Sequence, residues 1–252
     1  MNGAFTLIEL LVVIVIIGIL AKIAVPAFKG LGQGNTSAAA NRQILDDLGL
    51  ARLLAISERT TVYMVFVPAI TSAELSAHLA NIASSPELSP QQRSRVTRQM
   101  TNLVTGQFAS YALFTKRTVG AQPGQESPKY LTQWKTLPEG LLFNRNEFDL
   151  TKSSRPNEYE RSFAYDLKFP FPSARSPEIR LPYIAFNSQG QLLTQKDEIV
   201  TLTKGSILSV RDENGNAVGL ADVVETPPSN TNSIIRINWL TGRANVERPA
   251  LP

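Results

Sequence analysis

The chain begins with an apolar run that constrains what its first thirty residues can form. Leu10 to Ala21 contains no charged or hydrogen-bonding side chain, and the run ends at Lys22. As a helix that rises about 1.5 Å per residue, residues 5–27 would extend about 34 Å, close to the roughly 30 Å hydrocarbon core of a bilayer. We therefore predict a transmembrane or filament-core helix over residues 5–27.

One carboxylate, Glu9, lies at the edge of this run. An unpaired charge within a bilayer costs at least about 2.5 kcal/mol even on the most lenient insertion scale, so Glu9 needs a partner of opposite charge. A secretory signal peptide and a plain single-pass anchor are simpler alternatives. The first needs a positively charged start that residues 1–4 lack, and the second leaves Glu9 unexplained.

Phe5-Thr6-Leu7-Ile8-Glu9, followed by the apolar run with Gly18 and Pro26, resembles the N-terminal cleavage and methylation segment of the type IV pilins and pseudopilins. The resemblance implies that a prepilin peptidase removes a leader, residues 1–4, and methylates the new N-terminus at Phe5. It also implies that Glu9, fifth in the mature chain, pairs with the N-terminal amine of a neighbouring subunit. Gly18 and Pro26 belong to the same subunit-assembly segment.

The position of the cut has two alternatives. The usual residue before the cut in this family is Gly, whereas here Gly3 is followed by Ala4. A cut after Gly3 would make Glu9 the sixth residue and move its carboxylate out of register. We therefore favour cleavage between Ala4 and Phe5.

Beyond the apolar run the helical pattern weakens. Pro26 lacks the N–H that a helix interior needs, and three glycines follow it within the segment 28–36. We expect Pro26 to kink or interrupt the helix. The sequence predicts a flexible joint over residues 28–36.

Residues 37–252 predict one globular domain of the α+β class. Ile44, Leu48, Ala51 and Ala55 recur at helical spacing and form an apolar stripe, with Asp47 outside it. The stripe indicates an amphipathic helix that ends near Ser57 and packs on an antiparallel sheet. Two insertions interrupt the strands: a helical one near 69–107 on the outer surface, with Ser89 as N-cap, and a long loop near 144–181 tied down by its aromatic residues. Alternating and β-branched segments predict strands at 60–67, 110–115, 206–210, 233–240 and 243–246, and a strand, a turn and a second strand over 182–193.

Several segments of this domain resemble the H-type minor pseudopilins of type II secretion systems. They are Leu50 to Arg59 with the strand that follows, the stretch from Trp134 through Leu137-Pro138, and the closing turn Thr241-Gly242-Arg243. Trp134 and Phe143 are expected in the core. The resemblance implies a pilin-like fold, with one long N-terminal helix packed on an antiparallel sheet.

The composition argues against most catalytic and metal chemistry. The 252 residues include no Cys, and the formal charge of +4 is spread along the chain without a basic block, so we expect no thiolate metal site and no nucleic-acid partner. His78 is the only histidine and is predicted to be a surface residue. Asp212, Asn214 and Asn216 have the spacing of calcium ligands, but a hairpin turn explains them better because the later ligand positions do not fit. We predict no catalytic, cofactor-binding or metal-binding residues.

Together these patterns predict a structural subunit rather than an enzyme. The resemblance implies a minor pseudopilin of a type II secretion system or a minor pilin of a related filament. Its partners would be other pilins, the prepilin peptidase and an inner-membrane assembly platform. It would span the bacterial inner membrane once, with its domain in the periplasm, or at the cell surface after assembly. A major pilin, and a membrane-anchored enzyme or binding domain, are the alternatives.

Overall fold

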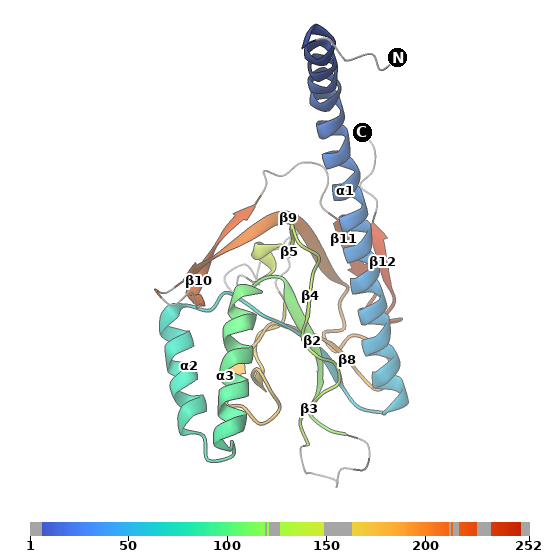
Figure 1. The fold of residues 1–252 in the computed structure, drawn as a ribbon. Helices are drawn as coiled ribbons and strands as arrows, with labels where there is room; N and C mark the ends of the chain where they lie inside the picture. The colour runs from blue at the N-terminus through green and yellow to red at the C-terminus, as the bar shows by residue number, and fades with distance from the viewer. Residues whose placement is uncertain are drawn as a thin grey trace.

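The structure is a computed structural model of the whole chain. It describes residues 7–118, 120, 127–148, 163–211, 213, 217–225 and 233–247, with only the backbone described at 9, 18–35, 209–210 and 217–225. The helix α1 (Leu7–Ser57) contains 51 residues, and its N-terminal half extends beyond the rest of the molecule (Figure 1). Its end at Ser57 confirms the predicted boundary of the amphipathic helix.

In the part of the chain that the structure describes, two further helices, a short 3-10 helix and twelve strands follow α1. In chain order they are β1 (Val62–Phe66), α2 (Ser72–Ser84), α3 (Pro90–Thr105), β2 (Ser110–Thr115), β3 (Lys129–Tyr130), β4 (Lys135–Thr136), β5 (Leu141–Phe143), η1 (Arg145–Phe148), β6 (Lys168–Pro170), β7 (Glu178–Arg180), β8 (Tyr183–Phe186), β9 (Glu198–Arg211), β10 (Ala217–Glu225), β11 (Ser233–Ile237) and β12 (Ala244–Glu247).

All strand pairings in these elements are antiparallel. The first sheet has the order β3-β2-β1-β8, with β4 also paired to β2, and the second has the order β10-β9-β11-β12, with β5 paired to β9. In the first sheet Tyr63 of β1 lies opposite Phe114 on β2 and Ala185 on β8. A small β6-β7 pair stands apart from both sheets. The α+β class with antiparallel sheets is therefore confirmed.

The two faces of the first sheet pack against different helices because side chains alternate along a strand. Met64 and Phe66 of β1 share a core cluster with Ile44 and Leu48 of α1. Tyr63 and Val65 of β1 face the other way, into a cluster with α3 residues such as Met100. The sheet therefore lies between α1 on one side and the α2–α3 pair on the other (Figure 1).

The predicted apolar stripe of α1 is confirmed as its buried face. Ile44, Leu48, Ala51 and Ala55 have no solvent exposure. Their cluster also includes residues of the second sheet, among them Val200 and Ile235, so α1 packs across both sheets. Truncating a large buried side chain of this kind to Ala typically costs about 2–5 kcal/mol.

The insertion near 69–107 forms the α2–α3 pair, and both helices begin with a capping box. Thr71 and Glu74 cap α2, and Ser89 and Gln92 cap α3, with Pro90 in its first turn. The predicted N-cap at Ser89 is therefore confirmed. The pair is less peripheral than expected, because α3 contributes Met100, Leu103 and Val104 to the core.

The segment near 144–181 is irregular apart from η1, β6 and β7, as predicted for the part that the structure describes. Three of its aromatic side chains are buried: Phe163 is 6% exposed, and Phe169 and Phe171 are fully buried. Tyr165 is half-buried, and Tyr159 lies outside the described residues. The three buried rings confirm that aromatic residues tie the segment to the sheet.

Several sequence predictions need correction. The helix runs without a break through Pro26 and residues 28–36, because the loss of one hydrogen bond and a few low-propensity glycines do not outweigh helical structure on both sides. The prediction that the helix is interrupted there is therefore wrong for this conformation, while mobility of the joint stays a prediction.

Two predicted strands also differ from the structure. The predicted strand 206–210 is only the end of β9. Residues 191–193 make a single bridge to β8, between Leu192 and Phe186, instead of a strand.

His78 is not a surface residue. Its side chain is 5% exposed, and Nε2–H donates a 2.7 Å hydrogen bond to the carbonyl oxygen of Phe171. Burial lowers the pKa of His78 below its ordinary value, with the hydrogen bond to Phe171 acting in the opposite direction. The imidazole therefore helps to hold the 163–181 segment against α2.

Trp134 and Phe143 were both expected in the core. Trp134 is half-buried, whereas Phe143 is in the core as predicted.

Candidate functional site

The residues predicted to act in processing and assembly lie at the N-terminal end. Ala4 and Phe5 are outside the described residues. Glu9, Gly18 and Pro26 belong to α1, but nothing beyond their backbone is described. The structure thus places these three on one helix, with about 26 Å between Glu9 and Pro26 at about 1.5 Å per residue. Their predicted roles in assembly stay predictions.

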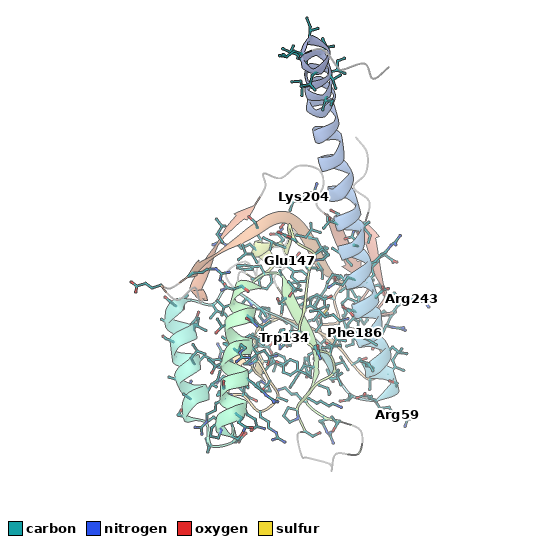
Figure 2. The ribbon with its side chains drawn as sticks, viewed as in Figure 1. Arg59, Trp134, Glu147, Phe186, Lys204 and Arg243 are labelled. Atoms are coloured by element: carbon teal, nitrogen blue, oxygen red, sulfur yellow. The ribbon has the colours of Figure 1, made fainter. Side chains whose placement is uncertain are left out.

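The described side chains at the start of α1 are apolar and exposed. From Leu7 to Ile17 the large side chains are between 49% and 84% exposed, with Leu7 the most exposed. They project from every side of the helix beyond the domain (Figure 2). A helix that is apolar all round is stable only when it is buried, since covering one such side chain is worth about 1.5–3 kcal/mol. This segment therefore requires an apolar partner outside the chain.

Among the residues that the structure describes, no helix has both the length and the apolar character needed to cross a membrane. The predicted span at 5–27 includes two undescribed residues, 5 and 6, and the undescribed side chains of Glu9 and residues 18–27. A membrane-spanning helix there stays a prediction.

A buried polar cluster joins the second half of α1 to the first sheet. Asp47 of α1 is 4% exposed, and its Oδ2 accepts a 2.6 Å hydrogen bond from the hydroxyl of Tyr111 on β2. Its Oδ1 lies 2.6 Å from Nζ of Lys135 on β4. Gln43 completes the cluster, because its Nε2 donates a 2.8 Å hydrogen bond to the Tyr111 oxygen. Burial, then the hydrogen bond to Asp47, raises the pKa of Tyr111 well above its ordinary value, so the phenol stays protonated.

Two further contacts fix α1 to the C-terminal strands. Asn41 Nδ2 donates a 3.0 Å hydrogen bond to Ser233 Oγ at the start of β11. Arg52 Nε donates a 2.7 Å hydrogen bond to the carbonyl oxygen of Thr241, in the turn between β11 and β12. Polar contacts therefore hold both ends of the packed half of α1 against the C-terminal strands.

The pairing of Asp47 with Tyr111 is not evident from the sequence pattern. Asp47 lies outside the predicted apolar stripe, yet in the structure it is buried beside the stripe residues Ile44 and Leu48. A carboxylate next to an apolar stripe was the available signal, because a buried charge requires a partner.

Glu147 is a second buried acidic residue, besides Asp47. Glu147 of η1 is 5% exposed, and its Oε1 accepts a 2.6 Å hydrogen bond from the backbone N–H of Thr201. Burial raises the pKa of Glu147 well above its ordinary value, Thr201 opposes the shift and the charge of Glu198 adds to it. No group of three or more potential metal ligands occurs among the described residues. Asp212, Asn214 and Asn216 lie outside them.

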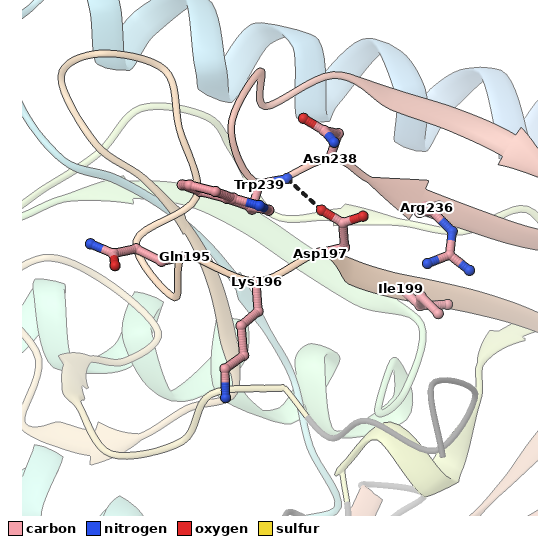
Figure 3. Close-up of a pocket in the computed structure, with 7 residues that line it drawn as sticks. All are labelled: Gln195, Lys196, Asp197, Ile199, Arg236, Asn238 and Trp239. Carbon is pink, nitrogen blue, oxygen red and sulfur yellow. Dashed lines mark hydrogen bonds between the residues drawn. The ribbon is translucent and has the colours of Figure 1, made fainter. Parts of the chain in front are cut away.

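A cleft of about 360 Å³ lies between the start of β9 and the β11–β12 hairpin (Figure 3). Two of its charged groups, Asp197 and Arg236, already make contacts within the protein. Asp197 Oδ1 accepts a 2.9 Å hydrogen bond from the backbone N–H of Trp239, and Arg236 forms an ion pair with Glu247. Lys196 points away from both (Figure 3). These contacts stabilise the β11–β12 hairpin, and the cleft does not bring an acid and a nucleophile together.

The comparison with known families supports the interpretation of the N-terminus. Residues 1–24 match the family described as the prokaryotic N-terminal methylation motif. No match was found among curated proteins or among solved structures. The match supports a type IV pilin-like, prepilin-type segment at residues 1–24 of this chain.

Proposed function

We propose that the chain is a minor pseudopilin of a type II secretion system or a minor pilin of a related filament. The observation that carries this proposal is the exposed apolar start of α1, Leu7 to Ile17, which lies within the methylation motif at residues 1–24. Such a helix finds the burial it needs either in a membrane or among the same helices of other subunits. The protein waits in the inner membrane, with its domain in the periplasm, and then enters a helical bundle.

In this proposal Glu9 sets the position of one subunit relative to the next. Its carboxylate pairs with the methylated amine of Phe5 on a neighbouring subunit, since an unpaired charge in the apolar bundle is costly. The attraction between the two charges is several-fold stronger there than in water. The contacts of Asp47 and Arg52 support the proposal, because they fix the domain to the helix that carries Glu9.

Filament incorporation of variants tests the role of Glu9. In the native host, Glu9→Ala is expected to be processed normally, as seen by the loss of the leader on immunoblots, but to be strongly depleted from sheared filaments. Asp46→Ala is the matched control, because Asp46 is an exposed acidic residue on the same helix. Equal incorporation of Glu9→Ala and the control would contradict the pairing.

Abundance separates a minor subunit from a major one. A minor subunit is expected at a small fraction of the molecules in purified filaments, measured by quantitative mass spectrometry against the other subunits. If this chain made up most of the filament, the major pilin alternative would replace the proposal.

A further inference from the structure

A groove on the side of the molecule opposite α1 has an unusual chemical lining. It encloses about 570 Å³, in the range of small-ligand sites, between α3, the β3–β4 connection and the segment after Phe171. None of the twelve described residues that line it is Asp, Glu, Lys, Arg or His. The cleft in Figure 3, by contrast, contains Lys196, Asp197 and Arg236.

Two aromatic rings of this groove are fixed in place by contacts at their polar ends. Trp134, labelled in Figure 2, donates a 2.8 Å hydrogen bond from Nε1 to the carbonyl oxygen of Pro172. Tyr130 donates a 2.7 Å hydrogen bond from its hydroxyl to the carbonyl oxygen of Pro170. The two ring centroids are 5.3 Å apart, and Phe171 contacts Trp134 edge-on at 5.2 Å. Because their polar groups are already bonded, the rings offer a ligand an apolar surface.

Around the rings lie side-chain amides with free hydrogen-bonding capacity. Gln99 and Asn102 come from α3 and Gln133 from the β3–β4 connection, and their amide groups make no hydrogen bond to the residues that the structure describes. Each amide provides two donors and one acceptor. The groove therefore combines a rigid aromatic surface with several uncharged donors and acceptors.

We propose that this groove binds a neutral oligosaccharide. A pyranose ring has C–H groups that pack on an aromatic face, whose partial charge is negative, and hydroxyls that both donate to and accept from amides. A charged ligand would lose hydration with no opposite charge to replace it. The groove lies on the side of the first sheet that α1 does not cover, so filament assembly through α1 leaves it open (Figure 1).

Isothermal titration calorimetry on the full chain tests the proposal. The protein is kept in a zwitterionic detergent without a sugar headgroup, and the probes are cellohexaose, maltohexaose and the hexamer of N-acetylglucosamine. We expect at least one probe to bind with a dissociation constant in the micromolar to low millimolar range. Failure of all three, or preferential binding of a neutral serine- and asparagine-rich hexapeptide, would overturn the proposal.

Variants locate the binding. Asn102→Ala and Gln133→Ala are each expected to weaken binding about threefold to tenfold, and Trp134→Ala at least about tenfold. Gln91→Ala, on the exposed start of α3, is the matched control and should bind like the wild type. If Trp134→Ala does not fold, the two amide variants decide. Binding that none of the groove variants changes would show that the groove is not the site.

Tryptophan fluorescence tests independently whether the oligosaccharide binds at Trp134. The chain has two tryptophans, so a Trp239→Phe variant leaves Trp134 as the only one. The bound probe is expected to shift the emission of this variant with the same dissociation constant as the calorimetry. A constant emission at saturating probe would contradict stacking on Trp134. Each measurement uses isolated protein, so its failure leaves the assembly proposal unaffected.

Discussion

The hydroxyl of Tyr111 on β2 lies 2.6 Å from Oδ2 of Asp47 on α1, within the buried contact between helix and sheet. The two residues are 64 positions apart in the sequence. Their hydrogen bond makes the orientation of the projecting helix depend on the folded sheet. A subunit that is pulled or anchored by its N-terminus benefits from such a fixed connection.

Removing Asp47 should destabilise the fold more than removing its charged partner. Asp47→Ala leaves the buried Tyr111 hydroxyl without its acceptor, so we expect the free energy of unfolding to fall by about 1–3 kcal/mol. The side chain of Lys135 is 41% exposed, and in Lys135→Ala the Asp47 carboxylate keeps its hydrogen bond from Tyr111, so this variant should cost less than Asp47→Ala. Chemical denaturation followed by circular dichroism measures both. Equal losses in the two variants would contradict the importance of the Tyr111 hydrogen bond.

Replacement by Ala should destabilise the fold much more at Gly242 than at Gly140, although both glycines have positive φ. A Cβ at Gly242 would lie 2.0 Å from the carbonyl oxygen of Gly190, whereas at Gly140 nothing lies within 4 Å. Both have positive φ, 61° and 84°, so both variants carry backbone strain of about 1–2 kcal/mol. We expect Gly242→Ala to lose about 1–3 kcal/mol more than Gly140→Ala. The same denaturation experiment measures the difference, and similar stabilities would argue against close packing of the two turns.

Glu147 should make the fold less stable as the pH rises. The folded chain holds this proton more tightly than the unfolded chain, because burial raises the pKa of Glu147 and the charge of Glu198 adds to the shift. The contribution to stability is full below about pH 4.3, the ordinary pKa of Glu, and is lost as the pH approaches the raised pKa. Glu147→Gln keeps an acceptor for the Thr201 N–H and cannot ionise.

We therefore expect the wild type to lose stability relative to Glu147→Gln as the pH rises above about 4.3, the ordinary pKa of Glu. Thermal unfolding followed by circular dichroism at several pH values gives the two curves. Glu139→Gln, at an exposed position in the connection between β4 and β5, is the control and should run parallel to the wild type. If the Glu147→Gln curve were also parallel, ionisation of Glu147 would have no part in stability.

Local patterns in the sequence predicted local structure well. The stripe of Ile44, Leu48, Ala51 and Ala55 gave the buried face of α1, and Ser89 with Pro90 gave the start of α3. These signals depend on residues within a few positions of one another, where helical spacing and capping chemistry decide the outcome. The class of fold followed from them.

Contacts between distant residues were not predictable in the same way. His78 bonds to Phe171, 93 positions away, and Asp47 to Lys135, 88 positions away. A polar residue that finds such a partner looks the same in the sequence as one that faces solvent. The beginning of β9 was missed for a related reason, because its pairing with β5 and β11 comes from elsewhere in the chain. The predicted roles of Phe5 and Glu9 depend on other molecules and need experiments on the assembled system.

Mass spectrometry of the mature N-terminus, on protein isolated from its native host, tests the central claim most directly. We predict that the chain begins at Phe5 and carries one methyl group on its amine. A chain that still begins at Met1, or one trimmed beyond Ala21 and released without its apolar segment, would contradict the proposed processing and assembly.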